Sequence, residues 1–458
     1  MNMEQMYDLI VVGGGPAGYA GAIKAAQLGK KVAVVEAVSV GGTCLNRGCV
    51  PTKSLMHAAE FFVSLNDGEK LGVAIDVSRV SYDYKRMVEN KNETVAKLRR
   101  GIETLFKQND IDFYSSYAKI ISSGSVVAGD QVLTARKILV ATGCAPAIPP
   151  IDGAGNEGVV TSDDALDFER VPNDIIIIGG GVIGVEFASL YNMLGSSVTV
   201  IEAESRILPL IDAELSRSTA MLLKKRGVTI ETSALVKKIE WIDNRLSCSY
   251  VVNGGEKQAA ADTVLIATGR RPNTEGLFDD SVKIALDKGY IVADTSGATS
   301  VDGIYAAGDV VKGAMQLAHV ASAMGENAVC AMFGQEPHYS MNAIPSCIYI
   351  SPEIASVGYT EKQARDEGIE CVTGKCVMGG NARTAIASSE RGFIKLVFES
   401  ESRTLIGAQL MCERATDIID ELTLAVEKKL ICDDLCRTVR AHPTFAEAIT
   451  EAAKAALH

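Results

Sequence analysis

Two cysteines, Cys44 and Cys49, stand five positions apart in a glycine-rich stretch and are the residues best suited to redox chemistry. On a regular helix, residues with this spacing have Cα atoms about 8.7 Å apart. A disulfide needs Cα atoms within ~6.8 Å of each other, so a bond between these two requires a bent backbone. Gly48 between them and Pro51 just beyond favour such a bend. A disulfide in a distorted turn is easily reduced, which suits redox cycling better than structural support.

The residues alone leave two interpretations of this pair open. Free cysteine behaves as a small hydrophobic residue, so both could be ordinary buried thiols. The glycines, Pro51 and Lys53 favour the redox interpretation, as does the nucleotide-binding pattern that precedes them. The chain has 11 cysteines without regular spacing, which fits a reducing compartment where a disulfide is more often catalytic than structural. We therefore expect a cytoplasmic protein.

The elements that position the cysteines begin with a nucleotide-binding pattern. Residues 8–12 form an apolar strand, residues 13–18 read Gly-Gly-Gly-Pro-Ala-Gly and open a helix to about Gly29, and a second strand at 31–36 ends in Glu36. This is the dinucleotide fingerprint in its required context, in which glycines let the backbone approach the pyrophosphate. We expect Glu36 to bind the ribose hydroxyls.

The same pattern occurs a second time. A strand at 175–178 leads into Gly-Gly-Gly-Val-Ile-Gly at 179–184, and a further strand ends in Glu202. Glu202 lies 23 residues after Gly179, as Glu36 lies 23 after Gly13, and both units close with Ala-Thr-Gly. Two complete units predict two dinucleotides. The negative charge of Glu202 stands where a 2′-phosphate would lie, so we expect the second to be NAD and not NADP.

Composition narrows the functional classes. The chain has 458 residues, enough for about three domains, and a net charge of −12. This acidic balance disfavours binding to nucleic acid or to anionic membranes. No apolar run approaches the ~20 residues of a membrane span, and the N-terminus lacks the basic region of a signal peptide. We expect no nucleic acid, no membrane and no metal site.

The remaining sequence completes an α/β fold with two Rossmann-like dinucleotide-binding domains and a C-terminal α+β dimerisation domain. A strand ends in Gly308-Asp309, and a helix starts near His319. From about Met341, short strands and two helices indicate the separate α+β domain, in which His442 precedes a helix that contains Glu447. We predict four segments: 1–147 and 272–340 for the first nucleotide-binding domain, 148–271 for the second, and 341–458 for the dimerisation domain.

Together these motifs resemble the pyridine nucleotide-disulfide oxidoreductases over essentially the whole chain, and among them the enzymes that oxidise lipoyl dithiols with NAD⁺. The resemblance implies FAD in the first unit, Cys49 facing the flavin, and Cys44 exchanging with substrate. It also implies Lys53 near the flavin, paired with Glu186. The residues expected to contact FAD or NAD are Gly13, Gly15, Pro16, Ala17, Gly18, Glu36, Gly42, Thr43, Lys53, Ala118, Ala141, Thr142, Gly143, Gly179, Gly181, Ile183, Gly184, Glu202, Gly269, Gly308, Asp309, Gln316, Leu317, Ala318 and His319.

The resemblance also implies an acid–base pair and partners. His442 is the expected base, oriented by Glu447, and in the family this pair serves the disulfide of the other subunit. A twofold homodimer follows from that. The substrate lipoyl group would be carried by a protein of a 2-oxoacid dehydrogenase or glycine-cleavage complex. Two positions depart from the usual pattern: Met324 replaces a glutamate, and Arg47, which we hypothesise stabilises a thiolate, lies between the cysteines.

Four alternatives are less well supported. Relatives of glutathione reductase use NADP and arginines after the second strand, where this chain has Glu202 and a lone Arg206. A mercuric reductase relative would carry a C-terminal cysteine pair, and an oxidase a single redox cysteine. A docking subunit that keeps its flavin without chemistry would not need the complete set of Cys44, Cys49, His442 and Glu447.

Overall fold

The computed structural model describes residues 6–389 and 392–457, which form two compact units. The first comprises the chain up to Ala147 together with Thr161–Arg170 and Gly269–Ser340. The second comprises Ile148–Val160, Val171–Thr268 and the chain from Met341 onward. The boundaries of the four predicted segments remain a prediction.

The first compact unit is built on a seven-stranded sheet of order β3-β2-β1-β6-β5-β4, in which β19 also pairs with β6. Strands β1, β2, β3, β6 and β19 run parallel, and β4 and β5 form an antiparallel extension. The strands are β1 (Tyr7–Val12), β2 (Val32–Glu36), β3 (Asp112–Ser115), β4 (Ala118–Ser122), β5 (Ser125–Ala128), β6 (Gln131–Val140) and β19 (Ile304–Ala306).

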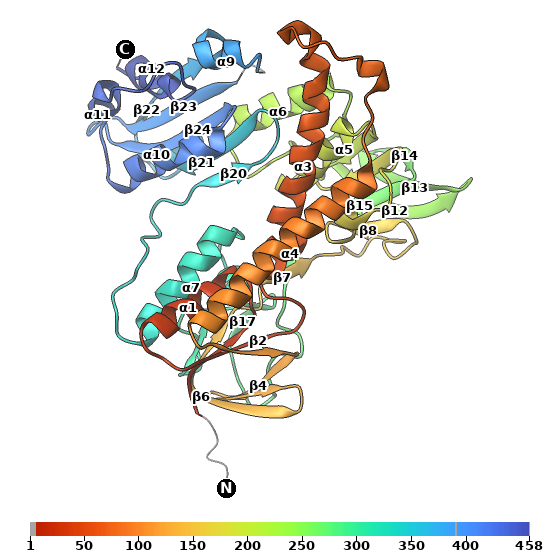
Figure 1. Cartoon of the computed structure of the whole chain (residues 1–458). Coiled ribbons are helices and arrows are strands. Elements are labelled where there is room, and N and C mark those ends of the chain that lie inside the picture. The colour runs from red at the N-terminus through yellow and green to blue at the C-terminus, as the bar shows by residue number, and fades with distance from the viewer. Residues whose placement is uncertain (1–5, 390–391, 458) are drawn as a thin grey trace. The chain divides into compact units, whose positions relative to one another are not determined.

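Both faces of this sheet are buried because its parallel strands are apolar on both sides, and helices supply most of the cover on one of them. Leu9 and Val11 of β1 lie in one buried cluster, and Ile10 and Val12 lie in the other. The helices are α1 (Pro16–Gln27), α2 (Gly42–Arg47), α3 (Cys49–Ser64), α4 (Tyr84–Gln108) and α7 (Ala318–Met332). Helices α1 and α7 pack side by side (Figure 1). Small two-stranded sheets pair β7 (Cys144–Pro146) with β16 (Arg270–Pro272) and β17 (Leu286–Asp287) with β18 (Tyr290–Ile291).

The second compact unit contains a five-stranded sheet of order β11-β10-β9-β15-β8. Its elements are β8 (Val159–Thr161), β9 (Asp174–Ile178), β10 (Ser197–Ile201), β11 (Thr229–Glu231) and β15 (Thr263–Ile266), with helices α5 (Val182–Met193) and α6 (Ala213–Lys225). The unit also has a three-stranded antiparallel sheet that the sequence pattern did not indicate, made of β12 (Ala234–Ile242), β13 (Arg245–Val252) and β14 (Gly255–Ala261).

The C-terminal part of the second unit is an α+β domain on an antiparallel sheet of order β20-β21-β24-β23-β22. The strands are β20 (Ser346–Ile348), β21 (Glu353–Gly358), β22 (Cys371–Val377), β23 (Phe393–Glu399) and β24 (Leu405–Cys412). The helices are α8 (Glu361–Asp366), α9 (Ala382–Ile386), α10 (Ala415–Glu427), α11 (Cys432–Arg437) and α12 (Glu447–Ala455), of which the sequence pattern had indicated α10 and α12.

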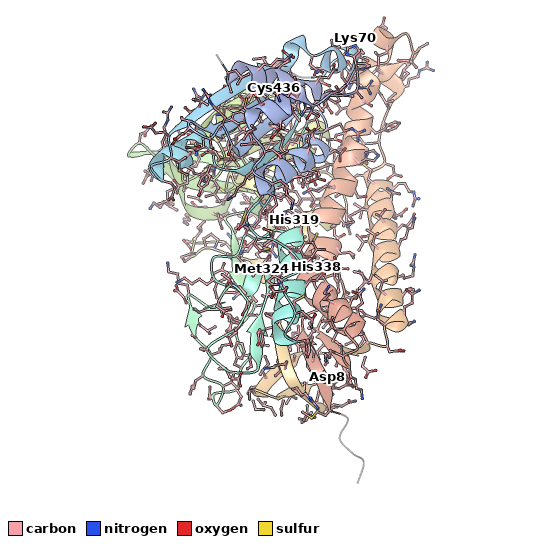
Figure 2. The ribbon with its side chains drawn as sticks, turned by 90° about the vertical axis from the view of Figure 1, so that its left-hand side faces the viewer. Asp8, Lys70, His319, Met324, His338 and Cys436 are labelled. Atoms are coloured by element: carbon pink, nitrogen blue, oxygen red, sulfur yellow. The ribbon has the colours of Figure 1, made fainter. Side chains whose placement is uncertain are left out.

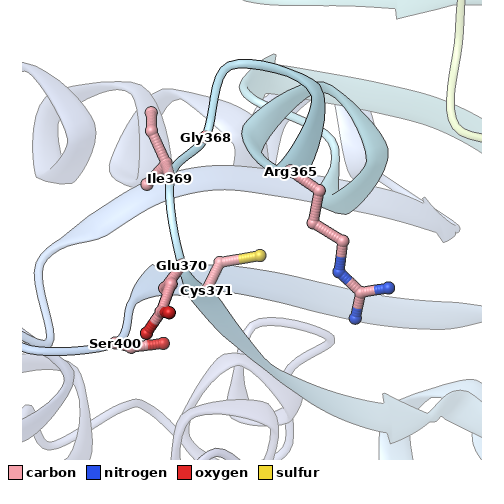
Figure 3. Close-up of a pocket in the computed structure, with 6 residues that line it drawn as sticks. All are labelled: Arg365, Gly368, Ile369, Glu370, Cys371 and Ser400. Atoms are coloured by element: carbon pink, nitrogen blue, oxygen red, sulfur yellow. The ribbon is translucent and has the colours of Figure 1, made fainter.

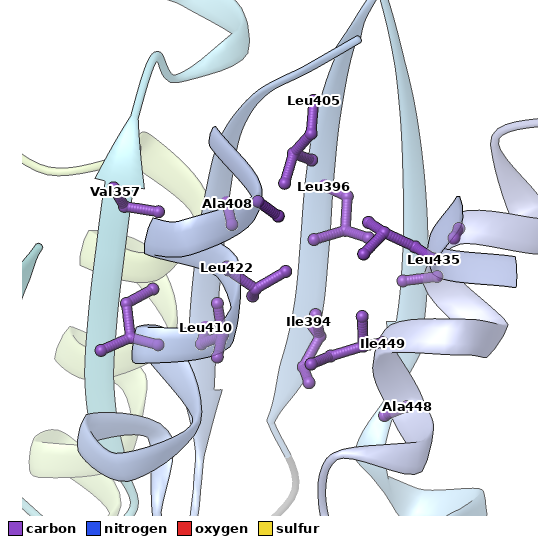
Figure 4. Packing of buried hydrophobic residues seen from close by; sticks show 14 of the residues in the cluster. Val357, Ile394, Leu396, Leu405, Ala408, Leu410, Leu422, Leu435, Ala448 and Ile449 are labelled. Atoms are coloured by element: carbon purple, nitrogen blue, oxygen red, sulfur yellow. The ribbon is translucent and has the colours of Figure 1, made fainter. Parts of the chain in front are cut away.

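The core of this domain lies between the sheet and its helices. Figure 4 shows Ile394, Leu396 and Leu410 of the sheet facing Leu422 of α10 and Ile449 of α12. All five side chains are fully buried. Burial of each such side chain contributes about 1.5–3 kcal/mol, so this layer holds the helix that carries Glu447.

None of the helices described above could cross a membrane. Among residues 6–389 and 392–457, no helix combines the length and the apolar character that a bilayer span requires.

Candidate active site

The two cysteines lie on either side of a break between two helices. Cys44 is in α2, Cys49 begins α3, and Gly48 between them has φ −147° and ψ −110°. A Cβ at Gly48 would come within 3.1 Å of the Thr43 carbonyl oxygen, so the turn is tight as well as bent. The predicted bend at Gly48 is therefore present, and it brings positions that a regular helix would separate close to each other.

The thiols of Cys44 and Cys49 are hydrogen-bonded to each other. This bond and burial raise the pKa of Cys44 above its ordinary value, and the positive charge of Lys53 lowers it. Cys44 is half-buried and Cys49 is exposed. The two sulfurs are therefore neighbours.

Arg47 has a different environment from the one hypothesised. Its guanidinium pairs with the carboxylate of Asp163 at 3.5 Å between Nη1 and Oδ2. The cation that lowers the pKa of Cys44 is Lys53, one turn beyond Cys49.

The first glycine-rich turn, Gly13–Gly18 with Glu36, is called here the first cradle. Gly13 has φ +105°, and a Cβ at Gly18 would lie 1.9 Å from the Gly13 carbonyl oxygen, so neither position accepts a side chain. The Glu36 carboxylate accepts hydrogen bonds from the backbone N–H groups of Gly14 at 2.7 Å and Val38 at 2.8 Å. The acidic strand end is therefore fixed beside the turn, as a ribose-binding carboxylate must be.

Two buried polar groups near this cradle fit a bound FAD. The hydroxyl of Thr142, directly after β6, is buried and has no hydrogen-bond partner among the described residues. Burial raises the pKa of Asp309, and the positive charge of Arg270 offsets part of that rise. An unsatisfied hydroxyl and a buried carboxylate are expensive unless a ligand supplies partners, and the hydroxyls of a flavin nucleotide would do so.

The second cradle, Gly179–Gly184 with Glu202, has nearly the same geometry. Gly179 has φ +111°, and a Cβ at Gly184 would lie 2.0 Å from the Gly179 carbonyl oxygen. The buried Glu202 carboxylate accepts hydrogen bonds from the N–H groups of Gly180 and Glu204. Arg206 donates to two backbone carbonyls, those of Pro209 and Ile211, and so is not available to a 2′-phosphate. These features fit NAD.

The predicted base and its orienting carboxylate are hydrogen-bonded. His442 Nδ1 lies 2.8 Å from Glu447 Oε1, and the other oxygen of Glu447 accepts the N–H of Thr444 at 2.9 Å. The hydrogen bond from Thr444, and then that from His442, lower the pKa of Glu447. Because Nδ1 is engaged, Nε2 is the nitrogen that can take up a proton. The imidazole is 71% exposed, so it is accessible to a substrate.

Other predicted residues lie on separate elements of the two compact units. Glu186 of α5 belongs to the second unit and accepts the N–H of Tyr349 at 3.0 Å, so its pairing with Lys53 stays a prediction. Ala118 begins β4, and His319 lies in the first turn of α7 (Figure 2). Met324, on the same helix, packs against the apolar clusters on both faces of the first sheet.

Sequence reasoning missed two residues around Asp309. Cys144 donates through Sγ to the Asp309 carbonyl oxygen at 3.1 Å. Arg270 donates to the Cys144 carbonyl oxygen at 2.6 Å and to the Thr43 hydroxyl at 3.4 Å. The only local signal was that each follows an Ala-Thr-Gly segment, and the contacts themselves depend on the pairing of β7 with β16.

An open hollow of about 380 Å³ on the C-terminal domain contains no predicted site residue. Figure 3 shows its lining of Arg365, Gly368, Ile369, Glu370, Cys371 and Ser400. No group of three or more His, Cys, Asp or Glu side chains suited to a metal ion is found in residues 6–389 and 392–457.

Sequence comparisons identify the family to which these features belong. Residues 7–325 match the pyridine nucleotide-disulphide oxidoreductase family, and residues 344–453 match its dimerisation domain. The chain belongs to the pyridine nucleotide-disulphide oxidoreductases.

Individual proteins resemble this chain over almost its whole length. The chain is 38% identical to a dihydrolipoyl dehydrogenase of Staphylococcus aureus over 456 residues, which cover 98% of this chain and 96% of the relative. A Geobacillus stearothermophilus dihydrolipoyl dehydrogenase is also 38% identical, over 455 residues with the same two coverages. Among solved structures, the HOCl-induced flavoprotein disulfide reductase RclA from Escherichia coli matches with a TM-score of 0.87 and 29% identity, covering 98% of this chain and 99% of that one.

Proposed function

We propose that this protein is a flavin-dependent dihydrolipoyl dehydrogenase, which oxidises a protein-bound dihydrolipoyl group and reduces NAD⁺ to NADH. The observation that carries the proposal is the Cys44–Cys49 dithiol at a helix break, with Lys53 beside it. Relatives at 37–38% identity over almost the whole chain bear that name.

The first cradle, Thr142 and Asp309 would hold FAD, and the second cradle would hold NAD. When bound, FAD supplies the two-electron relay between the dithiol and NAD⁺. The segment from Gly41 to Lys53 follows the first cradle in the chain, and a Cβ on Gly42 would come within 2.5 Å of the Gly15 Cα, which supports a position of the cysteines beside that nucleotide. Glu202 favours NAD because its charge would repel a 2′-phosphate.

The dithiol chemistry uses residues of the chain itself. One thiolate of the substrate attacks Cys44 of the oxidised pair, and the Cys44–Cys49 bond breaks with Cys49 leaving as thiolate. The second substrate thiol then attacks the mixed disulfide, so that the substrate becomes a disulfide and Cys44 is released. His442 takes up the proton of the attacking thiol at Nε2, while Glu447 holds the ring through Nδ1 and stabilises the imidazolium. Lys53 favours the thiolate form.

We also propose that the protein works as a homodimer in which His442 of one chain serves the disulfide of the other. The dimerisation domain of the family, at residues 344–453, supports this assembly. The lipoyl group would be carried by a protein of a 2-oxoacid dehydrogenase or glycine-cleavage complex.

The test is a Cys44→Ser variant assayed with lipoamide and NAD⁺. We expect loss of at least about 1,000-fold in activity, because the exchanging sulfur is gone, together with an unchanged flavin absorbance. Cys371→Ser is the matched control, since Cys371 lies in the hollow of the C-terminal domain and its loss should leave activity unchanged. Retained lipoamide activity in Cys44→Ser, or wild-type preference for glutathione disulfide and NADPH, would reject the proposal.

A further inference from the structure

The six-residue helix α2 is anchored on both sides of Cys44. Asn46 donates to the carbonyl oxygens of Val40 at 3.0 Å and Gly42 at 2.9 Å, and its own side-chain oxygen accepts two hydrogen bonds from Arg99 of α4, at 2.7 and 3.0 Å. Leu45 packs against a buried apolar cluster. Every one of these contacts fixes the helix that carries the exchanging sulfur.

The end of α2 is held by a carboxylate. Asp163 pairs with Arg47 through Oδ2, and its Oδ1 is buried without a hydrogen-bond partner among the described residues. Burial raises the pKa of Asp163, and the charges of Arg47 and Arg270 lower it, whereas neighbouring Asp164 raises it. Asp163 therefore interacts with two cations. Arg47 is the last residue of α2, and Arg270 donates to Thr43 near the start of the same helix.

Asp163 is presented by a firmly held segment. The segment Thr161–Arg170 is part of the first compact unit although the chain on either side of it belongs to the second. The ammonium of Lys91, which is 2% exposed, donates to the Leu166 carbonyl oxygen at 3.0 Å and pairs with Asp167. A buried lysine is costly to leave unpaired, so this anchor keeps the segment, and Asp163 with it, beside α2.

We propose that Asp163 is a positioning residue for the Cys44–Cys49 pair: its carboxylate holds Arg47 in an ion pair and keeps the guanidinium charge from acting on the two thiols. This inference rests on the proposed redox role of the cysteines. Arg47 lies three residues after Cys44 and two before Cys49, so a released guanidinium would stay close to both.

The sign of the effect follows from charge. Lys53 already lowers the pKa of Cys44. A second nearby cation would stabilise thiolates further, which stabilises the reduced pair and makes the disulfide more oxidising. Conversely, removing Arg47 would leave the half-buried Asp163 carboxylate without its partner, and that charge would disfavour thiolates. The two single variants are therefore expected to move the equilibrium in opposite directions.

The experiment equilibrates the purified holoenzyme with mixtures of reduced and oxidised dithiothreitol and counts alkylated Cys44 and Cys49 by mass spectrometry. In Asp163→Asn we expect the equilibrium constant for reduction to rise by about three- to tenfold, tenfold being about 30 mV for a two-electron couple. In Arg47→Gln we expect a fall. The double variant should lie near the wild type, because both charges are gone.

Controls separate this role from a purely structural one. Glu169→Gln removes the same charge from an exposed position of the same segment and should leave the equilibrium at the wild-type value. Asp163→Glu should retain most of the wild-type value. An unchanged or lowered constant in Asp163→Asn, or a rise that persists in the double variant, would overturn the inference. If Asp163→Asn does not fold, the Arg47→Gln variant decides. An equilibrium constant for reduction in Arg47→Gln that equals or exceeds the wild-type value would then overturn the inference. A wild-type pair that never interconverts between dithiol and disulfide would reject the proposed function itself.

Discussion

The first and second cradles share one backbone geometry and differ in how the chain continues beyond them. Both begin with a left-handed glycine, and in both the helix starts so close to that glycine that a Cβ at Gly18 or Gly184 would meet a carbonyl oxygen at 1.9 or 2.0 Å. After the first, a Cβ on Gly42 would come within 2.5 Å of the Gly15 Cα, so the redox segment lies directly on the turn. After the second, a Cβ on Gly181 would meet no described atom within 4 Å.

This difference indicates how one nucleotide-binding plan can serve two purposes. The first turn is covered by the segment that carries the cysteines, which suits a nucleotide that stays bound. At the corresponding glycine of the second turn, Gly181, a Cβ would have free space around it, which suits a nucleotide that enters and leaves in every cycle. After β10 the chain instead leads to Asp212, which caps α6 and pairs with Lys395 of the C-terminal sheet at 2.8 Å.

The largest effect should come from closing either cradle. Gly18→Ala and Gly184→Ala each place a Cβ against a carbonyl oxygen, and we expect each to lower the free energy of unfolding by at least about 3 kcal/mol. The two should differ in flavin: Gly18→Ala purifies without it, whereas Gly184→Ala retains it and binds NADH at least about 100-fold more weakly. Absorbance spectra and NADH titration measure both.

Gly101→Ala is the control for these two variants, because a Cβ at this position of α4 would enter open space. It should be neutral or stabilise by up to about 1 kcal/mol. If Gly18→Ala kept its flavin, or Gly184→Ala lost it, the assignment of the cradles would be wrong.

Next in size is the buried ion pair of the second compact unit. Lys395→Met leaves the carboxylate of Asp212, 8% exposed, without its cation, and we expect a loss of about 3–5 kcal/mol in a urea titration. Lys375→Met removes a more exposed partner of Glu214 and should cost about 1 kcal/mol or less. Equal losses of unfolding free energy in the two variants would show that burial does not determine how much such an ion pair contributes to stability.

Removing the charge of the second cradle should have an intermediate effect on binding. Glu202→Gln keeps the size of the side chain but weakens its charge-assisted hydrogen bonds, and we expect the Kd for NADH to rise by about tenfold. The ratio of NADH to NADPH affinity should fall at the same time. Glu36→Gln should leave that ratio unchanged, and a matching fall there would contradict the separation of the two sites.

The smallest expected effect is on stability and concerns Glu447, the partner of His442, which lies outside both cradles. Because the folded-state pKa of Glu447 is lowered, its contribution to stability is present above the ordinary glutamate pKa of about 4.3 and is lost as pH falls through the lower folded value. Wild type should therefore be more stable than Glu447→Gln near neutral pH, and the two should converge in acid. Unfolding measured from neutral to strongly acidic pH tests this, and a gap that widened in acid would contradict it.

Local patterns made much of the fold and site predictable from the sequence. The cradles, the strands that flank them and the bend at Gly48 depend on glycines within a few residues, and the pairing of His442 with Glu447 depends on one helix turn. These features were predicted correctly because the residues that form them are close in the chain.

Features that depend on distant pairing were not predictable. Nothing near Arg47 indicates that its partner is Asp163, more than one hundred residues later, and nothing in the segment after Thr161 indicates that buried Lys91 will anchor it. Helix α11 and the sheet of β12–β14 carried no signal strong enough to predict them. From the sequence, Arg47 is associated with the two cysteines because they are its neighbours in the chain. Its ion-pair partner, Asp163, is close to it only in the folded structure.

The alternation of the chain between its two compact units limits how the protein can be dissected. It crosses from one to the other after residues 147, 160, 170, 268 and 340. A fragment ending at Ala147 would lack β19 and α7, and with them a strand of its sheet and the helix that packs on α1. No single cut yields an intact half, so flavin-binding and dimerising parts of this enzyme should be studied by point substitution rather than by truncation.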